Sequence, residues 1–190
     1  MNFRTLLLAA ALMGASAAYA ETRAVIDTNM GSIELSLDET KAPQTVANFV
    51  QYAEKGFYNH TVFHRVIDGF MIQGGGMTSD LLEKPTQKAI VNEADNGLKN
   101  PAGTIAMART AAPNSATSQF FINLADNDFL NFKNKTTAGW GYAVFGKVIG
   151  GMDVVQKIAK QRTGYQRSFS DVPLKPIIIE KVRILKKGGK

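Results

Sequence analysis

Most of this chain consists of short apolar runs separated by turn-forming residues. Eight runs rich in Val, Ile, Leu or Phe are bounded by clusters of Gly, Asn, Asp or Pro, a pattern typical of β-strands joined by turns. In residues 32–37, Ile33, Leu35 and Leu37 alternate with polar residues, so one face is predicted to be buried and the other wet. The predicted strands are residues 24–28, 32–37, 61–66, 70–74, 104–108, 119–123, 143–149 and 177–185.

Two segments interrupt this pattern with the spacing of an amphipathic helix. Between Val46 and Ala53 apolar residues recur at intervals of three and four, with Pro43 near the start and Gly56 after the end, which predicts a helix over residues 43–55. Met152–Ala159 has the same spacing. Eight strands with two helices do not alternate as βαβ units must. The predicted fold class is therefore mainly β: a closed eight-stranded antiparallel β-barrel capped by two α-helices.

The first twenty residues have the pattern of a cleaved secretory signal peptide. Arg4 precedes an apolar run over residues 6–18, and Ala18-Tyr19-Ala20 is a small-x-small cleavage site. The run is shorter than the roughly 18 apolar residues that a membrane-spanning helix needs, so no membrane anchor is expected. We expect cleavage of residues 1–20 and a single domain over residues 21–190, located in the periplasm or secreted.

Composition and charge restrict the partners of such a domain. The chain has no Cys, which excludes a disulfide framework. Its formal net charge of +6 becomes +5 when Arg4 is removed with the signal peptide. Part of the excess positive charge lies in a basic tail over residues 181–190. We interpret the tail as the solvated end of the last strand, with contact to an anionic surface as the alternative. Nucleic acid is not an expected partner of an exported protein.

Common catalytic motifs do not account for the polar residues of this chain. His60 and His64 have the spacing of zinc ligands on a helix, but on a strand four residues span about 13 Å, and no metal site is predicted. The run Gly74-Gly75-Gly76 lacks the Lys-Ser/Thr of a phosphate-binding loop and is interpreted as a turn. No G-x-S-x-G motif of a serine hydrolase occurs.

One arginine is surrounded by apolar, aromatic and amide side chains. Alternation places Gln119 and Phe121 on one face of their strand, and the faces alternate likewise from Phe70 to Gln73. A buried cation is rare unless something uses it. The residues alone leave two interpretations open: a barrel core whose arginine reaches outward, or a functional surface. The cluster comprises Arg65, Phe70, Met71, Gln73, Gln119, Phe121 and Phe129.

Four ordered motifs resemble one known family. They are FHRVIDGFMIQGG, GTIAMART, NSATSQFFIN and YAVFGKVIGGMDVV, and together they resemble the cyclophilins, the cyclosporin-binding peptidyl-prolyl cis/trans isomerases, in particular the exported bacterial branch. The resemblance covers residues 25–185. It implies an eight-stranded antiparallel barrel with two helices, no cofactor, and proline-containing unfolded or partly folded polypeptides as partners.

The resemblance also implies a role for particular residues of this sequence. Arg65 matches the catalytic arginine, Gln73 its orienting glutamine, and Phe70 part of the hydrophobic pocket that receives the proline ring. The motifs assign substrate-binding positions to His64, Met71, Ala108, Arg109, Thr110, Gln119, Phe121, Phe129, Leu130 and Tyr142.

The sequence departs from the family pattern at several positions. Phe129 stands where the family has a Trp whose indole donates a hydrogen bond to cyclosporin, so weak binding of that drug is expected. Trp140 is not that residue, because the family position directly precedes Leu130. Arg109 stands where eukaryotic members often have Asn, and Tyr142 where many have His. A proline-binding chaperone and a surface-interaction protein remain the alternatives to an isomerase, and a monomer is the expected state.

Overall fold

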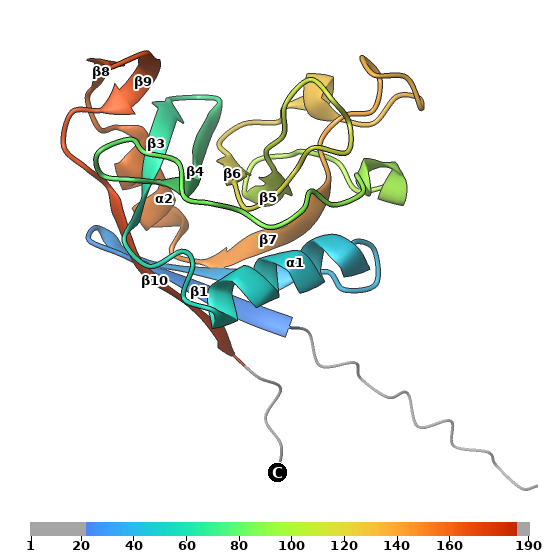
Figure 1. The fold of residues 1–190 in the computed structure, drawn as a ribbon, viewed down its shortest axis with the longest axis horizontal. Helices are drawn as coiled ribbons and strands as arrows, with labels where there is room; N and C mark the ends of the chain where they lie inside the picture. The colour runs from blue at the N-terminus through green and yellow to red at the C-terminus, as the bar shows by residue number, and fades with distance from the viewer. Residues whose placement is uncertain (1–21, 186–190) are drawn as a thin grey trace, which may run out of the picture.

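The computed structural model describes residues 22–185, so the predicted signal peptide and the end of the predicted basic tail lie outside the described residues. Eight strands close an antiparallel barrel in the order β1-β10-β3-β4-β6-β5-β7-β2 (Figure 1). The predicted fold class is confirmed. The strands are β1 Thr22–Thr28, β2 Gly31–Leu37, β3 Thr61–Ile67, β4 Met71–Thr78, β5 Thr104–Met107, β6 Phe120–Asn123, β7 Val144–Gly150 and β10 Ile178–Leu185.

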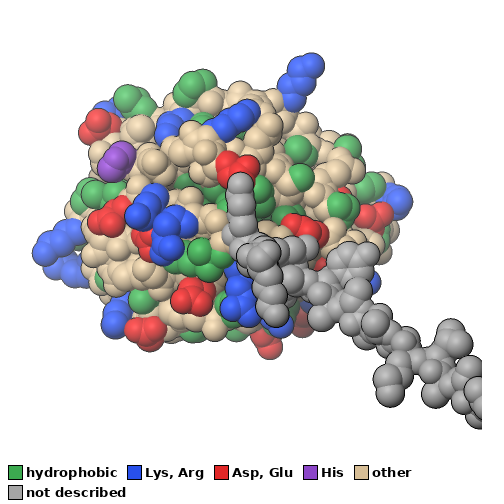
Figure 2. Space-filling model, turned by 90° about the horizontal axis from the view of Figure 1, so that it is seen from below, with side chains coloured by type: hydrophobic (Ala, Val, Ile, Leu, Met, Phe, Trp, Pro, Cys, Tyr) green, Lys and Arg blue, Asp and Glu red, His purple; other side chains and the backbone are tan. Residues whose placement is uncertain are grey.

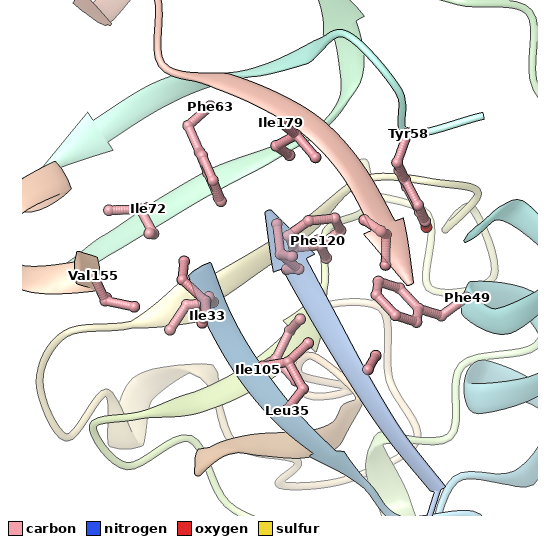
Figure 3. Close-up of a cluster of buried hydrophobic side chains, with 14 of the residues drawn as sticks. Ile33, Leu35, Phe49, Tyr58, Phe63, Ile72, Ile105, Phe120, Val155 and Ile179 are labelled. Carbon is pink, nitrogen blue, oxygen red and sulfur yellow. The ribbon is translucent and has the colours of Figure 1, made fainter. Parts of the chain in front are cut away.

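Two helices complete the barrel core with their apolar faces. They are α1, Pro43–Glu54, and α2, Met152–Ala159, within one residue of the predicted bounds. Phe49 of α1 and Val155 of α2 are buried in the same cluster as Phe120 of β6, where the close-up of the core shows all three (Figure 3). The rings of Phe49 and Phe120 meet edge to face, 5.7 Å apart, so α1 is held against the barrel by aromatic packing.

A second, two-stranded sheet was missed by the sequence analysis. It is formed by β8, Thr163–Gln166, and β9, Phe169–Pro173, and it stands beside β3 (Figure 1). Most residues of β8 are exposed or half-buried, so this strand shows no apolar alternation from which it could be predicted. The hairpin brings Asp171 next to β3, on the side where Arg65 lies.

The run of glycines at residues 74–76 is not the turn that was predicted. It lies inside β4, and of the three only Gly75 has a positive φ, of 86°. A Cβ on Gly76 would lie 2.4 Å from Cγ of Gln119, which is too close for any side chain. Glycine is therefore favoured at residue 76, because any larger residue would displace the Gln119 side chain that packs over the strand.

The long irregular stretches contain two short 3₁₀ helices, η1 at Ala94–Asn96 and η2 at Asp128–Leu130.

On the face seen in Figure 2, basic and acidic side chains lie side by side rather than in a patch of one sign. Within residues 22–185 no helix combines the length and the apolar character that crossing a membrane requires.

Candidate active site

An irregularity in β3 turns Arg65 to the outside of the barrel. Phe63 pairs with Gly74 and Arg65 with Gln73, so His64 is an extra residue between two consecutive pairs. Strict alternation would place Arg65 on the face of Phe63, which lies in the barrel core. The bulge reverses this orientation, as bulges near functional sites commonly do.

A row of side chains then crosses the outer face of the barrel. Arg65 pairs with Gln73, Gln73 with Phe121, and Phe121 with Ala106, on four adjacent strands. Their neighbours along the chain, such as Ile72 and Phe120, point into the core. The outer face therefore carries a second apolar cluster, formed by Met71, Ala106, Phe121, Leu130 and Val144.

A pocket of about 110 Å³ opens over this second cluster. Met71, Phe121 and Leu130 form buried parts of its wall, and the ring of Tyr142 meets that of Phe121 edge to face at 5.7 Å. The volume and the apolar wall suit a small apolar ring, with a cation at the rim. The lining residues are Arg65, Phe70, Met71, Gln73, Ala108, Arg109, Phe121, Leu130 and Tyr142.

A more polar groove of about 270 Å³ adjoins the pocket. Gln73, Ala108 and Arg109 line both, so the two hollows share one strip of wall. Thr110 and Gln119, predicted to bind substrate, line the groove together with Glu83 and Lys84, which the sequence analysis missed. An extended chain whose apolar ring occupied the pocket would continue along this groove.

The guanidinium of Arg65 is half-exposed rather than buried, which corrects the expectation of a buried cation. Its side chain keeps 43% of its accessible surface, and Nε lies 4.0 Å from Oδ2 of Asp171. The side-chain amide of Gln73 donates to Oε1 of Gln119 at 3.0 Å, and no hydrogen bond in the described part of the chain joins it to Arg65. The orienting role assigned to Gln73 stays a prediction. Arg65 is free to donate toward the pocket.

Buried asparagines hold the wall of the pocket. Nδ2 of Asn127 donates to the carbonyl of Phe70 at 3.0 Å and to Oδ1 of Asn123 at 2.8 Å. Asn123 in turn donates to Oδ1 of Asn100, at 3.1 Å, and to Thr104. Because η2 follows Asn127 directly, this network fixes Phe70 and Leu130 relative to β6.

Two predicted substrate-binding residues lie outside the pocket and the groove. Phe129 is 63% exposed and packs against Phe70, with ring centres 5.6 Å apart, so it forms the outer rim. The second residue is His64, which is only 5% exposed. Trp140 does not take the place of Phe129, because its indole N–H already donates to the carbonyl of Asn92 at 3.2 Å.

His64 is held neutral by its surroundings. Burial lowers its pKa to about 4; a backbone hydrogen bond with Val62 acts in the opposite direction, and the charge of Arg65 lowers the pKa further. Nδ1 is buried and has no hydrogen-bond partner. His64 therefore carries no charge at neutral pH. Among residues 22–185 no cluster of His, Asp or Glu has the composition of a metal site.

This burial predicts a specific dependence of stability on pH. The folded-state pKa of His64, about 4, lies below its ordinary value of 6.5, so between these pH values the unfolded chain binds more protons. Acidification from pH 6.5 to 4 should therefore remove up to about 3 kcal/mol of unfolding free energy through this residue alone. Urea unfolding of wild type and His64→Gln across this range measures the effect.

His60 supplies the matched control for that experiment, since it is the other histidine and is exposed. His60→Asn, a residue that tolerates the φ of 61° at this position, should follow the wild-type curve, whereas His64→Gln should be less stable at pH 7 but less dependent on pH in acid. Equal pH slopes in all three proteins would show that His64 titrates normally in the folded state.

Sequence reasoning missed Asp171 and Asn127 for different reasons. Asp171 reaches the site only through the hairpin that has no apolar pattern. Asn127 stands in an irregular stretch, where an asparagine usually indicates a turn. A repeated spacing was visible in Asn123, Asn127 and Asn131, but it gives no contact partner.

The chain is similar to known proteins over almost all of the described residues. A family model described as cyclophilin type peptidyl-prolyl cis-trans isomerase/CLD matches residues 23–184. Peptidyl-prolyl cis-trans isomerase B of Escherichia coli (strain K12) is 56% identical over 157 residues, covering 83% of this chain and 96% of that protein. Peptidyl-prolyl cis-trans isomerase A of Dickeya dadantii (strain 3937) is 52% identical over 183 residues, covering 96% and 95%.

Solved structures show the same architecture. The crystal structure of a cyclophilin type peptidyl-prolyl cis-trans isomerase from Cryptosporidium parvum matches with a TM-score of 0.73 at 27% identity, covering 89% of this chain and 100% of that one. A second crystal structure of that protein, in the presence of the dipeptide Ala-Pro, matches with a TM-score of 0.71 at 28% identity, covering 87% and 99%.

Proposed function

This chain belongs to the cyclophilin family of peptidyl-prolyl cis-trans isomerases, and we propose that it turns Xaa-Pro bonds with the Arg65 guanidinium and the pocket beside it. The observation that carries this proposal is the juxtaposition of a half-exposed arginine with an apolar pocket of about 110 Å³. The pocket would take the proline ring, and the groove would take the residues before it.

Rotation about an amide bond has a barrier of about 18–20 kcal/mol, because resonance must be broken. No bond to the substrate has to form, so the reaction needs no nucleophile. In the twisted transition state the prolyl nitrogen regains a lone pair and becomes a better hydrogen-bond acceptor. A guanidinium that donates to that nitrogen binds the transition state more tightly than either ground state, which is what acceleration requires.

Arg65 alone does not supply the whole effect. An acceleration of about 10⁵-fold requires roughly 7 kcal/mol, whereas one charged hydrogen bond contributes about 1.5–3 kcal/mol. The apolar wall formed by Met71, Phe121 and Leu130 would supply part of the remainder by fixing the ring while the groove holds the other side of the bond. A less aqueous pocket also disfavours the dipolar planar amide.

The substrates proposed here are proline-containing segments of exported proteins, in the periplasm or outside the cell. The structure determined in the presence of Ala-Pro concerns a relative, and it supports a proline-containing ligand for this chain. Export rests on the sequence of residues 1–20 alone. N-terminal sequencing of the protein recovered from the periplasm or medium is expected to begin at Glu21; an intact Met1 would refute processing.

The exchange rate of a short Ala-Pro peptide, measured by NMR at substoichiometric protein, tests the proposed function. An isomerase raises the exchange rate at each temperature in proportion to its concentration. A chaperone that only holds proline-containing segments would broaden or shift the peptide signals without raising the rate, and that result would overturn the proposal.

A further inference from the structure

Arg109 is a fixed cation without an acidic partner. Its Nε donates to the carbonyl of Gly141 at 2.9 Å, and Nη1 donates to the carbonyls of Thr110 at 2.8 Å and Ala111 at 3.3 Å. The guanidinium also stacks on Tyr142, 4.5 Å from the ring centre. These partners are neutral, and within residues 22–185 no carboxylate lies within 4.0 Å of Arg109. The charge is held in place but not neutralised.

The position of Arg109 puts this charge on the path of a bound peptide. Arg109 belongs to the strip of wall that the pocket and the groove share. Because the groove is proposed to take the residues before proline, a proline ring in the pocket would place the preceding one or two residues beside the Arg109 guanidinium. Nη2 makes no hydrogen bond in the described part of the chain, so it is available to a ligand.

The surrounding charges favour an acidic ligand at this point. The lining of the pocket contains Arg65 and Arg109 and no acidic residue. Asp171 faces Arg65, so it partly offsets that charge and not the charge of Arg109. In the groove, Glu83 and Lys84 have opposite charges, and the ammonium of Lys84 donates to the carbonyl of Phe57.

We propose that Arg109 makes this site select proline segments with a carboxylate side chain, Glu or Asp, within two residues before the proline. The proposal rests on the proposed use of the pocket by proline. A planar, pre-oriented guanidinium presents paired donors that match a carboxylate, whereas a lysine ammonium acts as a point charge. Because Arg109 is half-exposed, the preference is modest and falls with salt.

Three peptide series test this selectivity, with Glu, Gln or Lys placed at either of the two positions before proline. At low salt the wild-type protein should show a kcat/KM about three- to fivefold higher for Glu than for Lys at one position or both. The ratio should approach one at about 1 M salt. Arg109→Gln should bring the Glu-to-Lys ratio of kcat/KM to one, and Arg109→Glu should bring it below one. Arg109→Lys should give a ratio between one and the wild-type value.

Arg23→Gln is the matched control, because Arg23 is an exposed residue of β1 outside the lining of the pocket and groove, and its loss changes the net charge equally. It should keep the wild-type ratio. Equal kcat/KM for Glu and Lys peptides at low salt, or an unchanged ratio in Arg109→Gln, would overturn the role of Arg109. If the wild type turned over none of the peptides, the proposed function itself would be refuted. Failure of the proposed selectivity and failure of the proposed function are therefore distinguishable.

Discussion

Arg65→Lys is expected to lower kcat/KM by about 10²-fold while the affinity for an Xaa-Pro peptide changes by less than about threefold. The loss corresponds to about 2.7 kcal/mol, the range of a single charged hydrogen bond that forms only in the transition state. Lysine keeps the charge but not the planar fork, and its flexible stem does not hold one donor over the pocket. Exchange NMR gives the turnover, and titration of the same peptide gives the affinity.

Arg183→Lys is the matched control for this substitution. Arg183 lies on β10 and pairs with Asp27 through Nε at 2.7 Å, so the same chemical change is made at an arginine that contacts neither pocket nor groove. Turnover should remain at the wild-type level. If Arg65→Lys also turned over peptide normally, the guanidinium would not be the group that stabilises the twisted bond, and the pocket and groove would have to supply the whole effect.

The barrel was predictable because the pattern of apolar and polar residues within a strand indicates that strand without knowledge of its neighbours. In β2 every second residue is apolar, and the alternation correctly places Ile33, Leu35 and Leu37 in the core, although Ser36 of the predicted wet face is also buried. In β6 the residues Phe120, Phe121 and Ile122 are all apolar, so alternation indicates only that Phe120 and Phe121 lie on opposite faces, the core and the pocket. Alternation does not distinguish a solvated outer face from a functional one. The resemblance of the motifs to a known family indicated which part of the outer face is functional.

The orientation of Arg65 was not predictable from the same alternation. A bulge inserts one residue into the ladder, and its position depends on the register of β3 against β4 rather than on the residues of β3. Contacts made by irregular segments were equally unpredictable from the sequence. The hydrogen bond from Asn127 to the carbonyl of Phe70 joins residues 57 apart in the sequence, and nothing local specifies such a pair.

Asn127→Asp is expected to lower the free energy of unfolding by about 3–5 kcal/mol at pH 8. The Nδ2 group of Asn127 donates to two oxygen acceptors, on Phe70 and Asn123, in a buried site. A carboxylate of nearly the same shape donates to neither, and it brings a negative charge against both oxygens. Urea unfolding at pH 8, followed by circular dichroism, measures the loss.

The same variant should regain stability on acidification, and the direction follows from linkage. Burial beside two acceptors raises the folded-state pKa of the new carboxyl above its unfolded value of about 3.9, so the folded protein binds the proton more tightly. About 1 kcal/mol of the 3–5 kcal/mol deficit is the donated hydrogen bond that even the neutral carboxyl does not make, so the remaining ~2–4 kcal/mol corresponds to a folded-state pKa of about 5.5–7. The deficit should therefore be complete above that pH and shrink toward pH 5, leaving the loss of one of the two donated hydrogen bonds.

Two further variants separate the charge from the lost hydrogen bonds. Asn127→Ala should lose stability without this added pH dependence. Asn134→Asp places the same charge on an exposed asparagine whose Oδ1 only accepts hydrogen bonds, from Thr136, and should stay close to wild type in stability.

Because the network holds Phe70 and Leu130, Asn127→Ala should also raise KM for Xaa-Pro peptides under conditions where it is folded. An unchanged KM would mean that the pocket wall keeps its shape without the network, and that packing against Met71 and Phe121 is sufficient to hold it.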